Sequence, residues 1–493
     1  METMSAQVKQ ASPGSSGSIR SLLGPLVAII VGLFMVILDG TAVNVAIPKL
    51  QEEFNGSLSL VQWTVTGYAL AQAAIIPLAG WLSDRFGAKR IFLISVGLFT
   101  IGSLLCALAN TAELLILFRV LQGLGGGVVM PIAMAFVYRL SPPDKVGVVM
   151  GMMGIPILLA PALGPVLAGW LVDYVTWNWI FLINLPIGVI AVLIGIRTLP
   201  NIDRQSVASL DLLGMILAPL AFAALSYGVT EGATSWTEPK TLIGIAVGIV
   251  ALIAFVIVEL RHKNPLLELR VFASGNFSRG IIVQWVSQFA LFGSFFLVPI
   301  FLQTAKGYSA FETGLIMLPQ AIASGIFMPI GGKLSDRFGA RPLVLSGMTL
   351  VVLAAFFLSR VEASDGILSV MLPLALLGAG MGLFMMPLNT HLIQSAPQNL
   401  VGRVTSMTNA FQQVVSSLAI ATLTTISGNR MKDLLVEAQK PAPGVEEWTS
   451  AFNYTFFILL FIGVAGVALG LMLRRPKVDP NAEKSAEIHM MVG

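Results

Sequence analysis

Long apolar runs without charged residues alternate with short charged segments along nearly the whole chain. A transmembrane α-helix needs about 20 apolar residues, and runs of that length recur between residues 21 and 473. A transmembrane β-barrel would show weaker runs of alternating polarity. The pattern therefore predicts an all-α membrane protein with fourteen transmembrane helices. Their expected positions are 22–47, 60–82, 91–109, 114–138, 146–172, 178–196, 211–229, 241–259, 280–302, 313–333, 342–359, 367–392, 404–427 and 452–473.

One short charged segment occurs twice. Residues 80–90 read Gly-Trp-Leu-Ser-Asp-Arg-Phe-Gly-Ala-Lys-Arg, and residues 332–342 read Gly-Lys-Leu-Ser-Asp-Arg-Phe-Gly-Ala-Arg-Pro. Eight of the eleven positions are identical. The spacing matches the first six predicted helices to the last six in the same direction, and it leaves the two helices between them as an inserted pair. We expect two parallel six-helix repeats with the substrate path between them, as in many transporters.

The repeat and the distribution of charge predict the domains and the orientation. Because the number of helices is even, both termini lie on one side, and placing them in the cytoplasm puts most of the 29 Lys and Arg residues there. The expected parts are a disordered cytoplasmic tail (1–20), an N-terminal six-helix bundle (21–200), the inserted helices (201–262), a C-terminal six-helix bundle (263–475) and a second cytoplasmic tail (476–493).

The repeated segments resemble the signature loop of the major facilitator superfamily, and four further motifs are similar to its fourteen-helix drug:proton antiporter branch. These motifs are Leu38-Asp-Gly-Thr-Ala-Val-Asn-Val-Ala-Ile-Pro48, Arg119-Val-Leu-Gln-Gly-Leu-Gly125, Gly164-Pro-Val-Leu-Ala-Gly169 and Trp179-Ile-Phe-Leu-Ile-Asn-Leu-Pro-Ile-Gly188. The resemblance implies the major facilitator fold and a multidrug efflux transporter in the plasma membrane of a bacterium. Such a protein exports diverse lipophilic, chiefly cationic compounds in exchange for protons by alternating access. We expect a monomer whose partners are these substrates, protons and the lipid bilayer, with no nucleic acid.

Other functions remain as alternatives. A proton symporter or facilitator for a nutrient would have the same architecture, and a non-transporting membrane sensor would have a similar composition. The sequence has no Gly-x4-Gly-Lys-Ser/Thr phosphate loop, so ATP-driven pumping is unsupported. The single Cys106 and the scattered His262, His391 and His489 give no metal-ligand spacing. We therefore expect no enzyme activity, no metal and no cofactor, with the proton gradient as the energy source.

Two charged side chains are predicted to lie well inside the membrane. A charge at that depth costs several kcal/mol unless it is paired or hydrated. If the first helix ends near Pro48, Asp39 lies roughly 13 Å below the outer surface and Arg119 roughly 9 Å below it, from a rise of 1.5 Å per residue. Our hypothesis is that Asp39 pairs with Arg119 and leaves the pair on protonation, which couples the proton to conformation. The alternative is a permanent structural pair.

The repeated segments and the fifth helix carry two further predicted roles. We expect a conformational latch at the cytoplasmic face, with an anchor that only fixes the topology as the alternative. Its residues are Gly80, Asp84, Arg85, Gly87, Arg90, Asp336 and Arg337. In the fifth helix, the resemblance implies an antiporter motif that seals the two halves against leak, and an ordinary small-residue helix contact is the alternative. Its residues are Pro161, Gly164, Pro165 and Gly169.

Polar and aromatic residues within apolar runs are candidate substrate contacts. Gln284 and Gln288 are four residues apart and therefore share one face of a helix. The full set is Gln62, Trp63, Tyr68, Gln284, Trp285, Gln288, Gln320, Met386 and Asn389. For each of them, packing or an interfacial position is the alternative.

Overall fold

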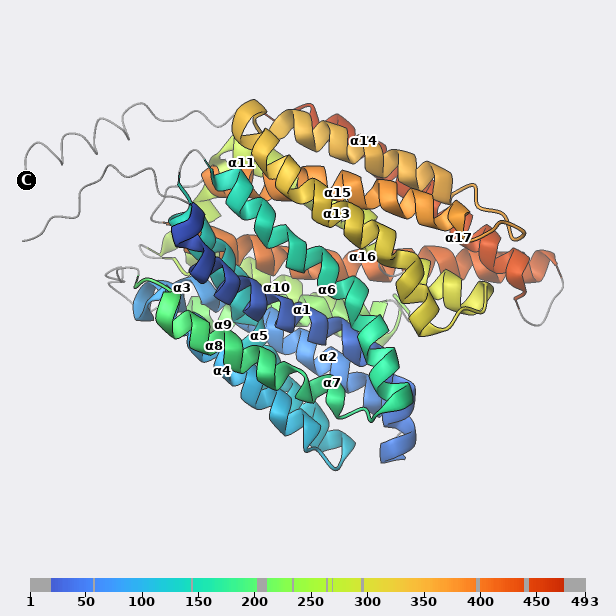
Figure 1. The fold of residues 1–493 in the computed structure, drawn as a ribbon, viewed down its shortest axis with the longest axis horizontal. Coiled ribbons are helices and arrows are strands. Elements are labelled where there is room, and N and C mark those ends of the chain that lie inside the picture. Colours follow the sequence, from blue (N-terminus) through green and yellow to red (C-terminus); the bar gives the residue numbers. More distant parts are fainter. Residues whose placement is uncertain are drawn as a thin grey trace, which may run out of the picture.

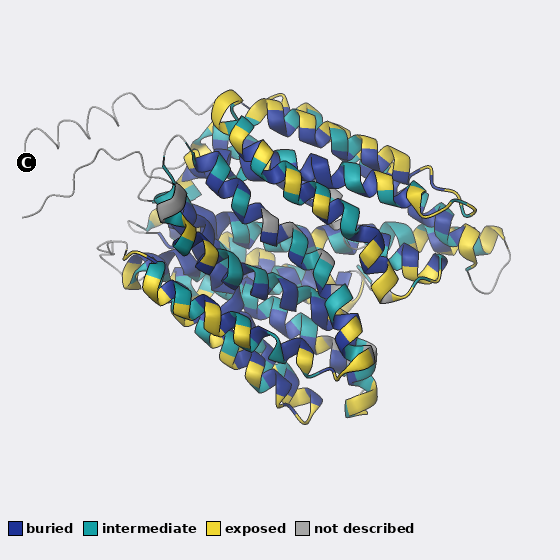
Figure 2. Ribbon diagram, in the orientation of Figure 1, coloured by how far each residue is buried: buried dark blue, intermediate teal, exposed yellow. Residues whose placement is uncertain are grey.

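The protein is an all-α membrane protein, seen here in a computed structural model that describes residues 19–55, 58–142, 145–201, 211–232, 235–262, 265–267, 269–293, 297–395, 400–438 and 443–473. Within these ranges all regular structure is helical. Among the described residues, thirteen helices are long and apolar enough to cross a membrane. Exposed residues lie on the outer faces of the bundle (Figure 2). They include large apolar side chains such as Ile101, Val250 and Phe461, which lipid would cover.

The helices have the following bounds in chain order: α1 Ile19–Phe54, α2 Leu58–Ile75, η1 Ile76–Leu78, α3 Ala79–Phe86, α4 Ala88–Ala107, α5 Ala112–Leu140, α6 Val146–Tyr174, α7 Trp179–Leu182, α8 Asn184–Thr198, α9 Leu212–Gly232, α10 Pro239–Arg261, η2 Leu269–Ala273, α11 Gly275–Phe292, α12 Val298–Ile300, η4 Phe301–Ala305, α13 Ala310–Phe338, α14 Ala340–Leu358, α15 Leu368–Gln394, α16 Val401–Glu437 and α17 Val445–Gly470.

The structure changes three of the predicted helices. The expected span 280–302 falls on α11, α12 and η4, with residues 294–296 outside the described ranges, and it is not among the thirteen candidate spans. The fourteenth span therefore stays a prediction. The expected end of the first helix near Pro48 is wrong, because α1 continues to Phe54, and α16 continues ten residues beyond the expected 427 to Glu437. Both helices carry polar residues past the apolar run, so hydropathy alone ended them too early.

The helices form two groups that lie side by side (Figure 1). Helices α1, α2, α4, α5, α6 and α8 pack on one another, and α11 and α13–α17 form the second group. Helix α6 packs on α13, and α3 packs on α16, across the boundary between the groups. The groups meet at the end of the bundle that carries the turns at Gly87 and Gly339, which we call the repeat-loop end. They diverge toward the opposite end (Figure 1). The domain limits given above stay a prediction.

The inserted helices α9 and α10 bridge the two groups on one side. They pack closely on each other, and α9 contacts both α2 and α16. The ring of Trp63 on α2 stacks on Tyr227 of α9 with ring centroids 6.1 Å apart. Just after α9, Trp236 Nε1 donates a hydrogen bond of 2.8 Å to Thr425 Oγ1 of α16. Helix α9 thus bridges α2 of the first group and α16 of the second group.

Glycines set the geometry of the repeated turns. Gly87 and Gly339 end α3 and α13 with φ of 92° and 82°. Side chains other than glycine adopt this left-handed region at a cost. Each turn reverses the chain directly into the next helix, and this places the two Asp residues of the repeated segments at the repeat-loop end.

The contact between α4 and α5 gives a test of the packing. A Cβ added at Gly102 of α4 would lie 2.8 Å from the Cα of Gln122, whereas one added at Gly97 of the same helix meets nothing within 4 Å. We expect Gly102→Ala to lower the stability by about 1 to 3 kcal/mol through overpacking. Thermal unfolding in detergent measures this. The matched control, Gly97→Ala, should melt at or above the wild-type temperature, and equal melting of the two variants would contradict the packing argument.

Candidate functional site

A buried ion pair joins the first and fourth spans. Asp39 lies on α1 and Arg119 on α5, and Arg119 Nη1 lies 2.5 Å from Asp39 Oδ2. Neither side chain has any exposed surface. Because an unpaired charge in this position would be costly, the contact stabilises both groups and fixes α1 against α5.

Two amide side chains complete the surroundings of the carboxylate. Gln122 Nε2 donates to Asp39 Oδ1 at 3.0 Å, and Asn184 Nδ2 donates to the same oxygen at 2.8 Å. The carboxylate therefore accepts hydrogen bonds from three side chains on α5 and α8. An ionised carboxylate is an acceptor only, so this set of donors suits the charged form of Asp39.

The guanidinium of Arg119 is held on several sides. Its Nε donates to the carbonyl oxygen of Thr64 at 3.1 Å, and its Nη1 also donates to Gln122 Oε1 at 2.7 Å. The ring of Tyr68 lies 3.8 Å from the guanidinium carbon, in the geometry of a cation–π contact. Within the described chain, Nη2 is buried without a hydrogen-bond partner. Arg119 thus has the two N–H donors of Nη2 unused and available for a rearranged state.

A cavity of about 340 Å³ lies between the two groups of helices. Among the residues that the structure describes, none with a charged side chain lines it. Its walls are apolar side chains together with amides and hydroxyls. Tyr68 lines the cavity with one side and covers Arg119 with the other, and Gly40 beside Asp39 also lines it. The ion pair is therefore one aromatic ring away from the cavity. The polar lining residues are Thr41, Tyr68, Gln72, Gln288, Asn409, Gln412, Gln413 and Ser416.

The candidate substrate residues divide according to this cavity. Tyr68 and Gln288 line it, and Gln288 Nε2 donates to Ser416 at 3.2 Å. Gln284 is buried and donates to Asn389 at 2.8 Å, beside the smaller void that Asn389 lines.

The remaining candidates lie elsewhere. Trp285 packs on Phe411, Gln320 lies against Met381, Met386 is fully buried in the core, and Trp63 is at the α9 contact. None of these four lines the cavity. The side chain of Gln62 lies outside the described part of the structure. Any substrate contact by these five residues stays a prediction.

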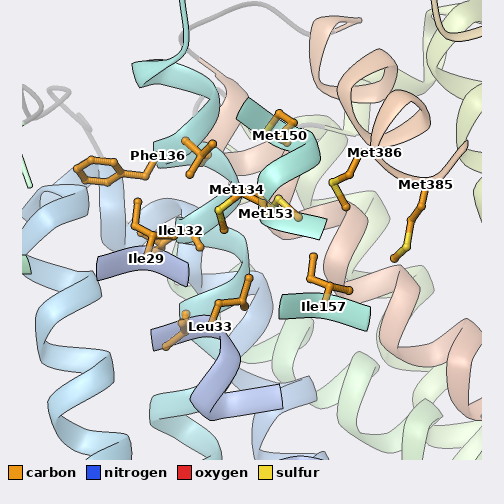
Figure 3. Packing of buried hydrophobic residues seen from close by; sticks show 14 of the residues in the cluster. Ile29, Leu33, Ile132, Met134, Phe136, Met150, Met153, Ile157, Met385 and Met386 are labelled. Atoms are coloured by element: carbon orange, nitrogen blue, oxygen red, sulfur yellow. The ribbon is translucent and has the colours of Figure 1, made fainter. Parts of the chain in front are cut away.

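Methionines and other apolar side chains fill the space between the cavity and the repeat-loop end. Met150 and Met153 of α6, Met134 of α5, and Met385 and Met386 of α15 belong to one buried cluster (Figure 3). Met385 also lines the cavity. These unbranched, flexible side chains fill the space that separates the cavity from the repeat-loop end in this structure.

The first repeated segment closes the repeat-loop end through ion pairs. Asp84 is buried, and its carboxylate oxygens lie 3.4 Å from Arg139 Nη2 of α5 and 3.6 Å from Arg403 Nε of α16. Gly80 lies against the backbone of Gly402, so a Cβ there would come within 2.8 Å of the Gly402 carbonyl oxygen. Asp84 thus links the two groups of helices.

The second repeated segment closes the same end in a different way. Asp336 accepts hydrogen bonds from the backbone amides of Gly147 and Val148, at 2.8 and 3.2 Å. These amides belong to the first turn of α6, where a negative charge also interacts favourably with the helix dipole. Of the other residues assigned to the latch, Arg85, Arg90 and Arg337 are exposed at this end.

The glycine- and proline-rich fifth span, α6, packs against both groups. Gly164 lies directly against Thr41 of α1, where a Cβ would overlap the hydroxyl. Pro161 lines the cavity, and Gly169 is buried. The side chain of Pro165 is outside the described part of the structure. Close packing of α6 on α1 and α13 is therefore observed, whereas a sealing role stays a prediction.

Sequence reasoning missed several residues of these two sites. Gln122 lies one helical turn after Arg119, and Asn184 interrupts an otherwise apolar run, so both had a recognisable signal. Arg139 and Arg403 had none, because each follows or precedes an apolar run like any other basic residue at a membrane surface.

Comparison with known proteins identifies the class. The family model of the Major Facilitator Superfamily matches residues 29–420. The chain belongs to this superfamily of membrane transporters.

Similar curated proteins come from bacteria. Lincomycin resistance protein LmrB of Listeria monocytogenes is 32% identical over 455 residues, which cover 92% of this chain and 96% of that protein. A multidrug resistance protein B homolog of Mycobacterium tuberculosis is 36% identical and covers 79% of this chain and 73% of its own length. Multidrug export protein EmrB of Haemophilus influenzae is 33% identical, with coverages of 87% and 84%.

Solved structures share the fold. The proton:xylose symporter XylE has a TM-score of 0.66 at 15% identity, and it covers 93% of this chain and 97% of its own. The human organic anion transporter MFSD10 has a TM-score of 0.65 at 13% identity, with coverages of 92% and 100%. At these identities the likeness concerns the fold alone.

The buried pair makes a testable prediction about stability. We expect Arg119→Ala to destabilise the protein by about 3 to 5 kcal/mol, because it leaves the Asp39 carboxylate buried without its countercharge. Asp39→Asn added to Arg119→Ala should restore much of this loss. Thermal unfolding of the single and double variants in detergent forms the double-mutant cycle. Strictly additive effects would mean that the two side chains do not interact energetically.

Proposed function

We propose that the chain is a proton-coupled antiporter that exports structurally diverse lipophilic, chiefly cationic drugs by alternating access. The observation that carries this proposal is the buried Asp39–Arg119 pair, one aromatic ring away from an uncharged cavity between the two halves. The drug-resistance and multidrug-export names of the relatives support efflux as the direction. The proposed location is the plasma membrane of a bacterium, with both termini and the repeat-loop end in the cytoplasm.

In this proposal Asp39 is the group that takes up the proton. The guanidinium of Arg119 stays protonated at any physiological pH, so only the carboxylate of the pair can titrate. Protonation removes its negative charge, weakens the contact with Arg119 Nη1, and leaves the guanidinium to find other acceptors. Tyr68 and Gly40 move with these groups because they are in contact with them. Proton uptake would thereby change the walls of the cavity.

The cavity suits lipophilic substrates of varied structure. Apolar side chains supply burial, and the amides of Gln288, Asn409 and Gln412 can each donate or accept a hydrogen bond. A cationic substrate would be attracted by the Asp39 carboxylate, for which the proton competes. Exchange of a monovalent cation for one proton moves no net charge, whereas exchange of a neutral compound for a proton gains about 2.3 kcal/mol per 100 mV.

The repeat-loop end is closed here, so the cavity would open to the outside in the proposed orientation. The opposite state requires Asp84 to leave Arg403 and Asp336 to leave the amides of Gly147 and Val148. These contacts would then act as the latch of the outward-facing state. Energy comes from the proton gradient, with no cofactor, and a monomer is sufficient for the cycle.

The main test concerns Asp39. In proteoliposomes with an imposed pH gradient, Asp39→Asn should reduce accumulation of labelled cationic compounds to the level of protein-free vesicles, because the amide keeps the shape but cannot titrate. The exposed Asp433 on α16 gives a matched control, and Asp433→Asn should transport like the wild type. Wild-type rates in the Asp39→Asn vesicles would overturn the assignment. A panel of neutral compounds tests the preference for cations in the same assay.

The second test concerns the latch. Asp84→Asn removes the charge that faces Arg139 and Arg403, and this should destabilise the closed repeat-loop end by on the order of 3 kcal/mol. We expect slower transport with little change in substrate affinity, which equilibrium binding and flux measurements distinguish. Asp433→Asn again serves as the control. Loss of binding itself would contradict the separation of latch and substrate site.

A further inference from the structure

Two carboxyl groups outside the site described above face each other in the inserted helices. Asp211 lies just before α9, Glu259 lies in the last turn of α10, and both are more than nine-tenths buried. They meet at Gly214, where an added Cβ would overlap Asp211 Oδ2 and lie 2.9 Å from Glu259 Oε1. The glycine therefore allows the two carboxyl groups to share one small space.

Each carboxyl group has one satisfied oxygen and one unsatisfied oxygen. The amide of Gly214 donates to Asp211 Oδ1 at 2.8 Å, and the amide of Leu266 donates to Glu259 Oε1 at 3.0 Å. Asp211 Oδ2 and Glu259 Oε2 are buried and have no hydrogen-bond partner in the described part of the chain. One proton could be shared between the unsatisfied oxygens, because a protonated carboxyl group can donate a hydrogen bond to an ionised one.

Two cations on elements packed near this pair, Arg403 and Arg270, are engaged elsewhere. Arg403 of α16 donates to the carbonyl oxygen of Pro265 at 2.8 Å and pairs with Asp84. Arg270 of η2 donates to the carbonyl oxygen of His262. Among the described residues, no cation forms an ion pair with Asp211 or Glu259. Without a countercharge among the described residues, two buried carboxylates side by side would repel each other, and this favours the neutral form of at least one of them.

We propose that Asp211 and Glu259 form a second proton-binding site, separate from Asp39, whose occupancy holds the repeat-loop end closed. The connection runs through residues 265–267. Leu266 and Leu267 are buried in the same core as Phe222 and Phe255, and the Leu266 amide holds Glu259. On the other side of this segment, the Pro265 carbonyl accepts from Arg403, which in turn faces Asp84 of the latch.

The direction of the pH effect follows from the charges. With one proton on the pair, the carboxyl groups can remain together and the 265–267 segment stays in place. Loss of that proton as the pH rises adds a second negative charge to a buried space, which drives the two groups apart and toward water. The movement displaces Leu266 and Pro265 and withdraws Arg403 from Asp84. Rising pH should therefore open the repeat-loop end, independently of any titration of Asp39.

Infrared difference spectroscopy of the reconstituted full chain tests the proton directly. A buried protonated carboxyl group gives a C=O stretching band that disappears on alkaline titration. We expect Glu259→Gln and Asp211→Asn each to remove this contribution, whereas Asp39→Asn should retain it. The second variant keeps the test available if the first fails to fold. An unchanged band in both Glu259→Gln and Asp211→Asn would overturn the proposal.

Distances between spin labels test the link to the latch. Phe86 and Phe338 are exposed at equivalent positions of the two repeats, and the buried Cys106 can stay unchanged. In the wild type, the population with a short distance between these labels should fall as the pH rises. In Glu259→Gln this fall should be smaller than in the wild type, because the contribution of the pair is lost while Asp39 and Asp84 still titrate, and in Asp39→Asn the contribution of the pair should remain. Equal pH dependence in Glu259→Gln and the wild type would overturn the proposal, while the result for Asp39 in transport would still stand.

Discussion

The cost of a charge away from water governs how this chain is put together. The buried ion pairs described here join different helices. Asp39 of α1 meets Arg119 on α5 and Asn184 on α8, and Asp84 meets Arg139 and Arg403 on α5 and α16. Hydrophobic burial is weak between helices that lipid could equally surround, so these polar contacts specify which helices are neighbours and at what depth. The same contacts are the ones that a proton can break.

Small residues make these contacts possible by bringing backbones together. Gly102 allows α4 to approach Gln122, Gly80 allows α3 to approach α16, and Gly214 leaves space for two carboxyl groups. In each case a side chain at the glycine would push apart the polar groups that the approach unites. Close packing and the polar contacts therefore depend on the same glycines, and a substitution at one of these glycines would alter both.

Simple helical geometry predicted that Asp39 and Arg119 pair, and the structure shows this contact even though the end of the first helix was placed wrongly. The comparison of Asp39 with Arg119 needed only their relative depths, which a change of a few residues at a helix end hardly affects. Gln122 and Asn184 had a weaker signal than the charged residues, because a neutral amide inside an apolar run costs less than a charge. Glu259 resembled an ordinary charge at a helix end, because its burial depends on residues 265–267 folding back over it. Contacts of this kind come from the path of the chain, which hydropathy does not record.

The duplication also explains why the two halves need not share their chemistry. At the offset that aligns Gly80 with Gly332, Asp39 corresponds to Leu291 and Arg119 to Met371, so the ion pair has no charged equivalent in the second half. Leu291 lines the cavity, and the polar cavity residues of that half are the amides and hydroxyl on α11 and α16. Under the proposed function, the first half would bind the proton and the second half would supply most polar contacts to the substrate. Coupling then requires that the two halves move against each other. Among the described residues, the contacts of Asp84 and Asp336 are polar links that cross between the halves at the closed end, so such a movement would have to break them.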